Sequence, residues 1–103
     1  MLQFGGLSIF PASRTVTLDG KQLNLPPKEF DLLSNLAQNE HIAFSRERLL
    51  ELVWGYRYYG DGRTVDTHVK SLRDHLGPYR TVIQTVWGVG YKFEYAKESI
   101  KET

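Results

Sequence analysis

The sequence predicts an α+β domain in which an N-terminal antiparallel sheet and a C-terminal β-hairpin flank a core of three helices. β-Forming residues alternate around Asp19-Gly20 and again around a glycine-rich turn near the C-terminus, and three segments between them carry apolar residues at helical spacing. The 103 residues are enough for one modest core, and 41% hydrophobic with 24% charged residues is typical of a globular protein.

Residues 2–25 are expected to form the N-terminal sheet. Leu7–Phe10 and Thr15–Leu18 are rich in β-forming residues, and residues 11–13 break the pattern between them. Asp19-Gly20 is a two-residue hairpin signal between alternating apolar residues. The segment therefore predicts three or four short strands, which carry no cluster of chemically active side chains and are interpreted as scaffold.

The first helix is predicted over residues 27–39. Pro27 suits the first helical position, and Glu29 and Asp31 in the first turn favour the helix dipole. Position 26, where a capping Ser or Thr would stand, is Pro, so Glu29 lacks the partner of a capping box. The face expected to be buried carries Phe30, Leu33, Leu36 and Ala37.

The second helix is predicted over residues 45–54, with Ser45 as its cap and Gly55 at its end. Its buried face is expected to consist of Leu49, Leu50 and Val53. Arg46 and Arg48 lie in the first turn, where cations oppose the helix dipole. Two interpretations stay open: these arginines bind an external anion such as phosphate, or they are solvated.

A glycine-bracketed loop, residues 55–62, separates the second helix from the third, which gives a helix-turn-helix with an enlarged turn. The loop holds three tyrosines and one arginine. Exposed aromatic side chains would suit contact with another protein, whereas the structural alternative is that one or two tyrosines pack on the core. The four side chains are Tyr56, Arg57, Tyr58 and Tyr59.

The third helix, residues 63–76, carries the strongest periodic signal. Its apolar residues recur at intervals of four, three and four and form one narrow seam, made of Val65, Val69, Leu72 and Leu76. Gly77-Pro78 then ends the helix. The side opposite the seam carries Arg63, Thr67, Lys70 and Asp74, with Ser71 on its shoulder. Such a face is either an ordinary solvated surface or one that reaches bases and phosphates in a DNA major groove.

Residues 81–95 predict a hairpin around Trp87–Gly90, with Tyr91, Phe93 and Tyr95 on one face. A hairpin that follows a recognition helix is the layout of a winged helix-turn-helix, in which the wing tip approaches the adjacent minor groove. We therefore expect a single domain over residues 1–95 and a frayed tail over residues 96–103.

Charge and composition restrict the function further. Residues 45–92 hold eight basic and five acidic side chains, so the +1 charge of the chain hides a mild local excess of +3. DNA affinity must then depend on placed contacts more than on bulk attraction. The chain has no cysteine for a disulfide or a thiolate metal site, and no long apolar run or secretion signal, so a cytoplasmic location is the default.

Catalysis is not expected, and neither is a cofactor or a metal. His68 and His75 share one flank of the third helix, but seven residues of helix separate them by about 10.5 Å, too far for one metal ion. The sequence contains no phosphate-binding glycine loop and no nucleophile motif.

Four motifs stand out along the chain: PPKEFDLL, FSRERLLELVWG, GDGRTVDTHVKSLR and TVWGVGYKF. With these motifs, in this order and approximate spacing, the sequence resembles the C-terminal DNA-binding effector domains of OmpR/PhoB-type response regulators of bacterial two-component systems. The likeness extends from the leading strands to Phe93. It implies a four-stranded N-terminal sheet, a three-helix core, a C-terminal wing, and tandem binding to direct repeats in promoter DNA.

The resemblance also implies roles for individual residues. Thr67 and Ser71 match positions that approach bases, and the loop of residues 55–62 matches a segment that contacts RNA polymerase in some members. The positions that match contacts to the DNA backbone are Arg46, Trp54, Arg63, Thr64, His68, Lys70, Arg73, Thr85 and Tyr91.

Two departures from the family pattern leave the target sequence open. The wing tip carries Trp87 where arginine is common, so it could pack against sugars or tuck back into the protein, and Ser71 replaces an arginine found in some members. The family's receiver domain and its sensor kinase are expected in a full-length protein, of which this chain is an excised domain, or else a stand-alone homologue. The alternative function is a winged helix that binds only protein.

Overall fold

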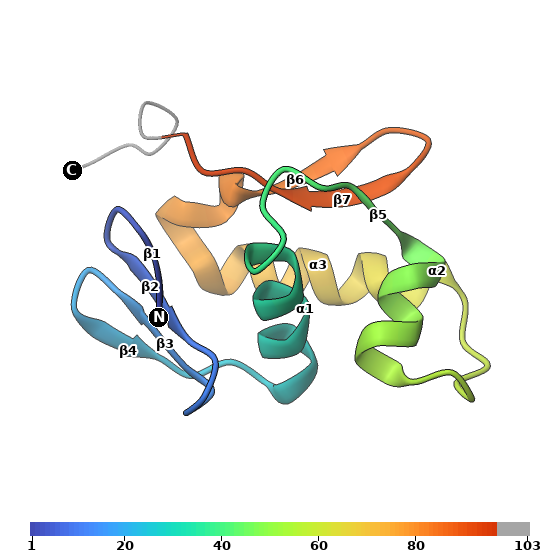
Figure 1. Cartoon of the computed structure of the whole chain (residues 1–103), viewed down its shortest axis with the longest axis horizontal. Helices are drawn as coiled ribbons and strands as arrows, with labels where there is room; N and C mark the ends of the chain where they lie inside the picture. The colour runs from blue at the N-terminus through green and yellow to red at the C-terminus, as the bar shows by residue number, and fades with distance from the viewer. Residues whose placement is uncertain (97–103) are drawn as a thin grey trace.

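The computed structural model describes residues 1–96, arranged as two small sheets around a helical core (Figure 1). The predicted tail therefore lies, apart from its first residue, outside the described residues. The elements in chain order are β1 (Leu2–Phe4), β2 (Leu7–Phe10), β3 (Thr15–Leu18), β4 (Lys21–Leu23), α1 (Pro27–Ala37), β5 (Phe44–Ser45), α2 (Arg46–Leu49), the π-helical turn η1 (Leu50–Trp54), α3 (Gly62–Leu76), the 3₁₀ helix η2 (Gly77–Val82), β6 (Ile83–Val86) and β7 (Gly90–Phe93).

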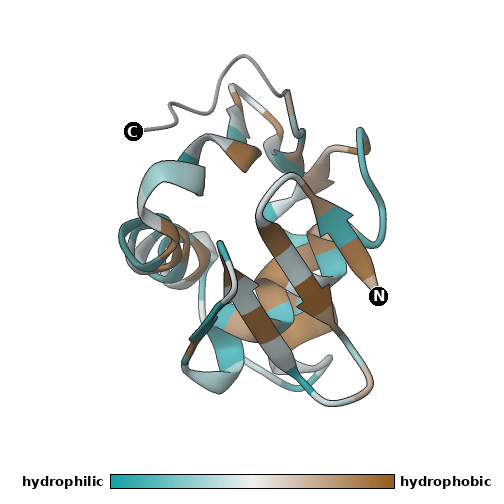
Figure 2. Ribbon diagram, turned by 90° about the vertical axis from the view of Figure 1, so that its left-hand side faces the viewer, coloured by the Kyte–Doolittle hydropathy of each residue, from teal (hydrophilic) through white to brown (hydrophobic). Residues whose placement is uncertain are grey.

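The N-terminal sheet has four antiparallel strands in the order β1-β2-β3-β4, which confirms the predicted meander. Asp19 and Gly20 both have positive φ, the backbone form that a two-residue turn between twisted strands requires. Apolar residues alternate with polar ones along these strands (Figure 2). The inner face of the sheet buries Leu7, Ile9 and Val16 against the helical core.

Helix α1 lies between the N-terminal sheet and α2, with α3 crossing behind it (Figure 1). It ends at Ala37, two residues before the predicted end. Ser45 caps α2 as predicted, since its hydroxyl accepts the N–H of Arg48 at 3.0 Å. The predicted second helix then continues through η1 and ends at Gly55, whose N–H bonds to carbonyls four and five residues earlier.

The apolar seam of α3 is buried along its whole length, as predicted. Asp61 caps the helix through the N–H of Arg63, so α3 begins one residue before the predicted start. The far end is tied to the N-terminal sheet, because the Tyr79 hydroxyl donates to Asp19 at 2.8 Å and accepts the N–H of Gly6 at 3.1 Å. The segment that follows α3 therefore connects this helix to the N-terminal sheet.

The C-terminal sheet differs from the predicted hairpin in three ways. Residues 81 and 82, predicted as strand, belong to η2, so β6 starts only at Ile83. A third strand, β5, pairs with β7 through Phe44 opposite Tyr91 and Ser45 opposite Gly90. Finally, β7 ends at Phe93, two residues before the predicted end of the hairpin. Of the three aromatic residues predicted to share one face, Tyr91 and Phe93 are buried, and Tyr95, beyond the strand, is partly buried against the core. We call β6, β7 and the turn between them the wing.

Candidate nucleic-acid interface

The outward face of α3 is open to solvent over most of its length. Thr67, Lys70 and Asp74 are exposed and Ser71 is half-buried, while the seam on the opposite side of the helix is covered. Neither sheet covers this face. A helix held in this way can lie against a flat or grooved partner without unfolding any other part of the domain.

The two hydroxyls on this face are already hydrogen-bonded within the chain. Thr67 Oγ1 donates to the Arg63 carbonyl at 2.9 Å, and Ser71 Oγ donates to Glu29 Oε2 at 2.9 Å. Glu29 lies on α1 and is only 3% exposed, and its other oxygen is 2.6 Å from His75 Nδ1. Ser71 is thus held toward α1, whereas Thr67 bonds only along its own helix.

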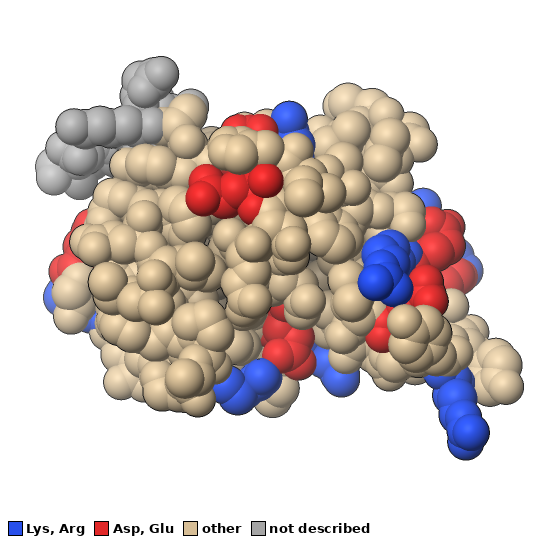
Figure 3. Space-filling view, viewed as in Figure 1, with Lys and Arg blue, Asp and Glu red and all other residues tan. Residues whose placement is uncertain are grey.

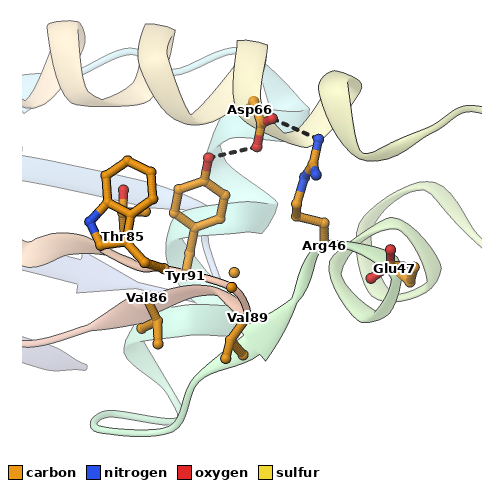
Figure 4. A pocket seen from close by; sticks show the side chains of 10 residues that line it. Arg46, Glu47, Asp66, Thr85, Val86, Val89 and Tyr91 are labelled. Atoms are coloured by element: carbon orange, nitrogen blue, oxygen red, sulfur yellow. Dashed lines mark hydrogen bonds and ion pairs between the residues drawn. The ribbon is translucent and has the colours of Figure 1, made fainter.

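The start of α3 is linked to α2 and to the wing through Asp66. Arg46 donates to Asp66 Oδ2 at 2.8 Å and to the Gly62 carbonyl at 3.2 Å, while the Tyr91 hydroxyl donates to Asp66 Oδ1 at 2.6 Å (Figure 4). Burial and this bond to Asp66 raise the pKa of Tyr91 to about 12. Arg46 is therefore not simply solvated, and its misplaced charge in the first turn of α2 is balanced within the fold.

An open hollow of about 380 Å³ lies between α3, the start of α2 and the wing. It brings together three of the predicted backbone contacts, Arg46, Thr85 and Tyr91 (Figure 4), and Trp87 also lines it. The hollow shows that residues far apart in the sequence form one concave surface beside the outward face of α3.

Arg73 joins α3 to the wing from the other side. Its guanidinium donates to the Ile83 carbonyl at 2.7 and 3.0 Å and to Thr85 Oγ1 at 3.0 Å, and it lies 5.6 Å from the centre of the Tyr91 ring. Desolvation in this half-buried place lowers the pKa of Arg73 from its ordinary value. The side chain thus fixes the angle between α3 and β6.

Three further predicted backbone positions cluster beside the start of α3. The Trp54 and His68 rings pack edge to face with centroids 4.9 Å apart, and His68 Nδ1 lies 2.8 Å from the Thr64 carbonyl. Because a carbonyl only accepts, Nδ1 carries the hydrogen and Nε2 is the ring nitrogen left for other contacts. Lys28 of α1 lies 5.9 Å from the Trp54 ring and donates to the Val53 carbonyl at 3.0 Å.

The start of α3 also carries an exposed ion pair. Arg63 donates to Asp61 at 2.9 Å, and these side-chain bonds, with the backbone N–H of Arg63, lower the pKa of Asp61. The Arg63 side chain is 86% exposed. Over the face seen in Figure 3, basic and acidic side chains are interspersed, in keeping with the mild charge of the sequence.

The wing tip and the α2–α3 loop both project aromatic side chains into solvent. Trp87 is 90% exposed and so does not tuck back into the protein. In the loop, Tyr59 is 98% exposed and Tyr56 and Tyr58 are also exposed, so none of the three tyrosines is buried in the core. The centroids of the Tyr58 and Trp54 rings are 6.1 Å apart, and Arg48 donates to the Tyr56 hydroxyl at 3.4 Å.

Two residues important to this surface were assigned no such part from the sequence. Sequence reasoning relates Glu29 only to the helix dipole and the capping box, and it gives Asp66 no role. The sequence did contain a signal for Glu29, because it shares helical spacing with the buried Leu33 and Leu36. Within residues 1–96, no group of acidic, histidine or cysteine side chains could hold a metal ion, and no helix has the length and apolar character needed to cross a membrane.

Comparison with known proteins decides the family. A family model described as "Transcriptional regulatory protein, C terminal" matches residues 20–93. The chain belongs to this family. It is 52% identical over 96 residues to the transcriptional regulatory protein YclJ of Bacillus subtilis, covering 91% of this chain and 42% of the relative. It is 49% identical over 98 residues to SrrA of Staphylococcus aureus, covering 91% of this chain and 41% of the relative.

Solved structures agree with the family assignment. The DNA-binding domain of Klebsiella pneumoniae RstA, solved with the RstA box, is 35% identical at a TM-score of 0.81 and covers 91% of this chain and 96% of that one. The AdeR DNA-binding domain, solved with an intercistronic region, is 26% identical at a TM-score of 0.79, covering 93% and 100%.

A longer response-regulator chain also matches. DrrB, an OmpR/PhoB homologue of Thermotoga maritima, is 40% identical at a TM-score of 0.80, covering 88% of this chain and 42% of that one. The resemblance to OmpR/PhoB-type effector domains and the predicted winged helix-turn-helix are both confirmed. The chain spans about two fifths of the length of the curated relatives it matches. The family is one of transcriptional regulators and not of enzymes.

Proposed function

We propose that this domain binds double-stranded promoter DNA in a sequence-dependent manner, with α3 in the major groove and the wing at the adjacent minor groove. The observation that carries the proposal is the pairing of a buried seam with an open polar face on α3, where Thr67 and Lys70 are exposed. A major groove admits one helix, and side chains on its outer face then meet the base edges.

The cationic groups around that face suit contacts to phosphate. Lys70 extends from the outward face, and Arg46 borders the hollow beside the wing. Arg63 is paired with the exposed carboxylate of Asp61 and can exchange it for a phosphate. Each neutralised phosphate releases counterions, so binding should weaken as salt rises. The remaining proposed backbone contacts are Trp54, Thr64, His68, Arg73, Thr85 and Tyr91.

Base recognition is assigned to Thr67 and Ser71, and the wing contact to Trp87. The exposed indole supplies a flat apolar surface and one N–H but no positive charge, so it would pack against the deoxyribose walls of the minor groove. Specificity at the wing would then depend on the shape and deformability of the DNA instead of on attraction of a cation to a narrow groove.

Further partners follow from membership in a response-regulator family. The exposed Tyr56, Arg57, Tyr58 and Tyr59 would contact RNA polymerase, and two copies would bind direct repeats. In the full-length protein, a receiver domain controlled by a sensor kinase would regulate this domain. A chromosomal target implies action in the cytoplasm.

The competing function is a winged helix that binds only protein. The exposed Trp87 and loop tyrosines suit it, but the DNA complexes of AdeR and RstA, two similar domains, favour DNA. An electrophoretic shift assay with promoter fragments separates the two. Sequence-selective retardation supports the proposal, and its absence at low salt contradicts it.

Lys70→Ala provides the quantitative test. Removing one phosphate contact should weaken binding to all sequences and lower the slope of log K against log salt by about one unit. Lys21→Ala is the matched control, because Lys21 is an exposed lysine on β4 of the N-terminal sheet, outside the proposed interface. An equal loss for both variants would show that Lys70 contributes only general charge and would remove α3 from the proposed interface.

A further inference from the structure

The hydroxyl of Thr67 has no free hydrogen to offer a base. Its oxygen lies 2.9 Å from the Arg63 carbonyl, one turn earlier in α3. A carbonyl oxygen has no hydrogen, so the threonine must be the donor in this bond. A hydroxyl has one hydrogen and two lone pairs, which leaves Thr67 able to accept hydrogen bonds but not to donate a second one.

Ser71 is restricted in the same way by another partner. Its oxygen lies 2.9 Å from Glu29 Oε2, and a carboxylate only accepts. Glu29 is 3% exposed, and its other oxygen is bonded to His75 Nδ1 at 2.6 Å. Turning Ser71 away would leave a buried carboxylate oxygen without this donor, which costs far more than losing an exposed hydrogen bond.

The DNA bases divide according to this restriction. In the major groove, adenine N6 and cytosine N4 carry amino hydrogens, whereas guanine O6 and N7 and thymine O4 only accept. Resting on the DNA-binding function proposed above, we infer that Thr67 and Ser71 act as hydrogen-bond acceptors and select adenine or cytosine at the bases they reach. Guanine and thymine at those positions find no donor in either hydroxyl.

Glu29 then acts as a positioning residue, because it reaches no DNA itself but determines what Ser71 can offer. Glu29→Gln replaces an acceptor-only group with an amide that can donate to Ser71. The serine hydrogen would then be free to reach guanine or thymine. The variant should relax the base preference at the Ser71 position and leave the preference at the Thr67 position unchanged, a pattern that a general loss of stability would not produce.

The first test is selection of bound duplexes from a random pool. It uses the wild-type chain and the variants Thr67→Val, Ser71→Ala and Glu29→Gln. Ser8→Ala is the control, because it removes a hydroxyl from β2 of the N-terminal sheet. Wild type and control should select adenine or cytosine at two base positions. Thr67→Val and Ser71→Ala should each lose the preference at one of them. Circular dichroism establishes that each variant is folded.

The second test removes only the amino group. Duplexes in which the selected adenine is replaced by purine, or the selected cytosine by 2-pyrimidinone, should bind wild type about three- to tenfold more weakly, the effect of one lost hydrogen bond. The same replacement should not weaken binding further in the variant that lacks the matching hydroxyl. These two replacements also distinguish adenine from cytosine as the source of the amino group.

The outcomes of these tests separate the acceptor assignment from the proposed DNA-binding function on which it rests. Selective binding with guanine or thymine at positions that depend on Thr67 or Ser71 would overturn the acceptor assignment while leaving DNA binding intact. Selective binding that does not change in Thr67→Val and Ser71→Ala would also overturn it. A failure of the wild-type chain to enrich any sequence would overturn the proposed function, and this inference with it.

Discussion

Two carboxylates, Glu29 and Asp66, hold α3 from opposite directions. Glu29 belongs to α1 and points toward α3, where it bonds to Ser71 and His75 and is only 3% exposed. Asp66 belongs to α3 and reaches outward to Arg46 and Tyr91, with 42% of its side chain exposed. One group is closed off from water, and the other lies beside the hollow at the wing.

The difference separates two tasks that a recognition helix must combine. The C-terminal half of α3 is fixed to the body of the domain through a buried acceptor whose removal would leave polar groups unpaired. Its N-terminal half instead organises groups that themselves belong to the proposed interface. We therefore expect removal of the Glu29 side chain to lower stability as well as to alter the base preference at Ser71, and changes at Asp66 to act mainly on the charge presented to DNA.

The largest effect is expected from Glu29→Ala. It leaves the Ser71 hydroxyl and His75 Nδ1 without their buried acceptor and should reduce the free energy of unfolding by about 1–3 kcal/mol. Urea unfolding followed by circular dichroism measures this. Glu47→Ala, an exposed carboxylate on α2, should change stability by less than about 0.5 kcal/mol. Equal losses in the two variants would abolish the distinction between a buried and an exposed carboxylate.

Asp66→Asn should lower stability less than Glu29→Ala does, and it should strengthen DNA binding. The amide oxygen can still accept from Tyr91, but the ion pair with Arg46 is lost, so we expect a cost of about 0.5–1 kcal/mol. One negative charge fewer and a released arginine should strengthen binding to non-specific duplex at low salt by roughly two- to fivefold. Weaker binding would show that Arg46 needs Asp66 to be placed against the DNA.

Tyr91→Phe tests the same site through pH. Because the folded state holds the Tyr91 proton up to a pKa of about 12, above the ordinary value, the hydroxyl's contribution is fully present below the ordinary pKa and is lost as pH rises through the folded one. The free energy of unfolding of the wild type, measured by urea unfolding over a series of pH values, should exceed that of Tyr91→Phe by about 1 kcal/mol at neutral pH. This difference should shrink above about pH 10. A difference that stays constant to pH 11 would contradict the bond to Asp66.

The smallest effect is expected from Asp74→Ala. Asp74 and Arg80 are 3.9 Å apart with side chains 64% and 59% exposed, so water screens this pair. Thermal and urea unfolding should show a change within about 0.5 kcal/mol. A larger loss would mean that exposure is a poor guide to the energetics of charges on α3.

Periodic and local signals in the sequence predicted most of the fold. The apolar spacing of α3, the Asp19-Gly20 turn and the Ser45 cap each depend on a few neighbouring residues, and each is found in the structure. β5 was missed because two residues are too short to show alternation, and its pairing depends on β7, about 45 residues away. Residues 81 and 82 are β-forming residue types, which predicts a strand. The same side chains also suit the 3₁₀ turn that continues from α3, so their type alone does not separate the two structures.

The candidate site was less accessible to sequence reasoning, because its partners come from separate elements. The outward face of α3 could be placed from spacing alone, but not the bonds that fix its hydroxyls, since Glu29 and Ser71 are 42 residues apart. Likewise, nothing local indicated that Asp66 would meet both Arg46 and Tyr91. Helical spacing indicates which side chains face outward, whereas their hydrogen-bonding state depends on the packed structure.

The distribution of indole rings gives the domain a built-in optical probe. The chain has two tryptophans, Trp87 at the wing tip and Trp54 packed beside His68, and both belong to the proposed DNA contact surface. Tryptophan emission, excited at wavelengths that tyrosine scarcely absorbs, therefore originates from that side of the molecule. Titration with unlabelled duplex should quench the solvent-exposed component and shift its spectrum, so that docking of the wing can be followed in real time without attaching a dye.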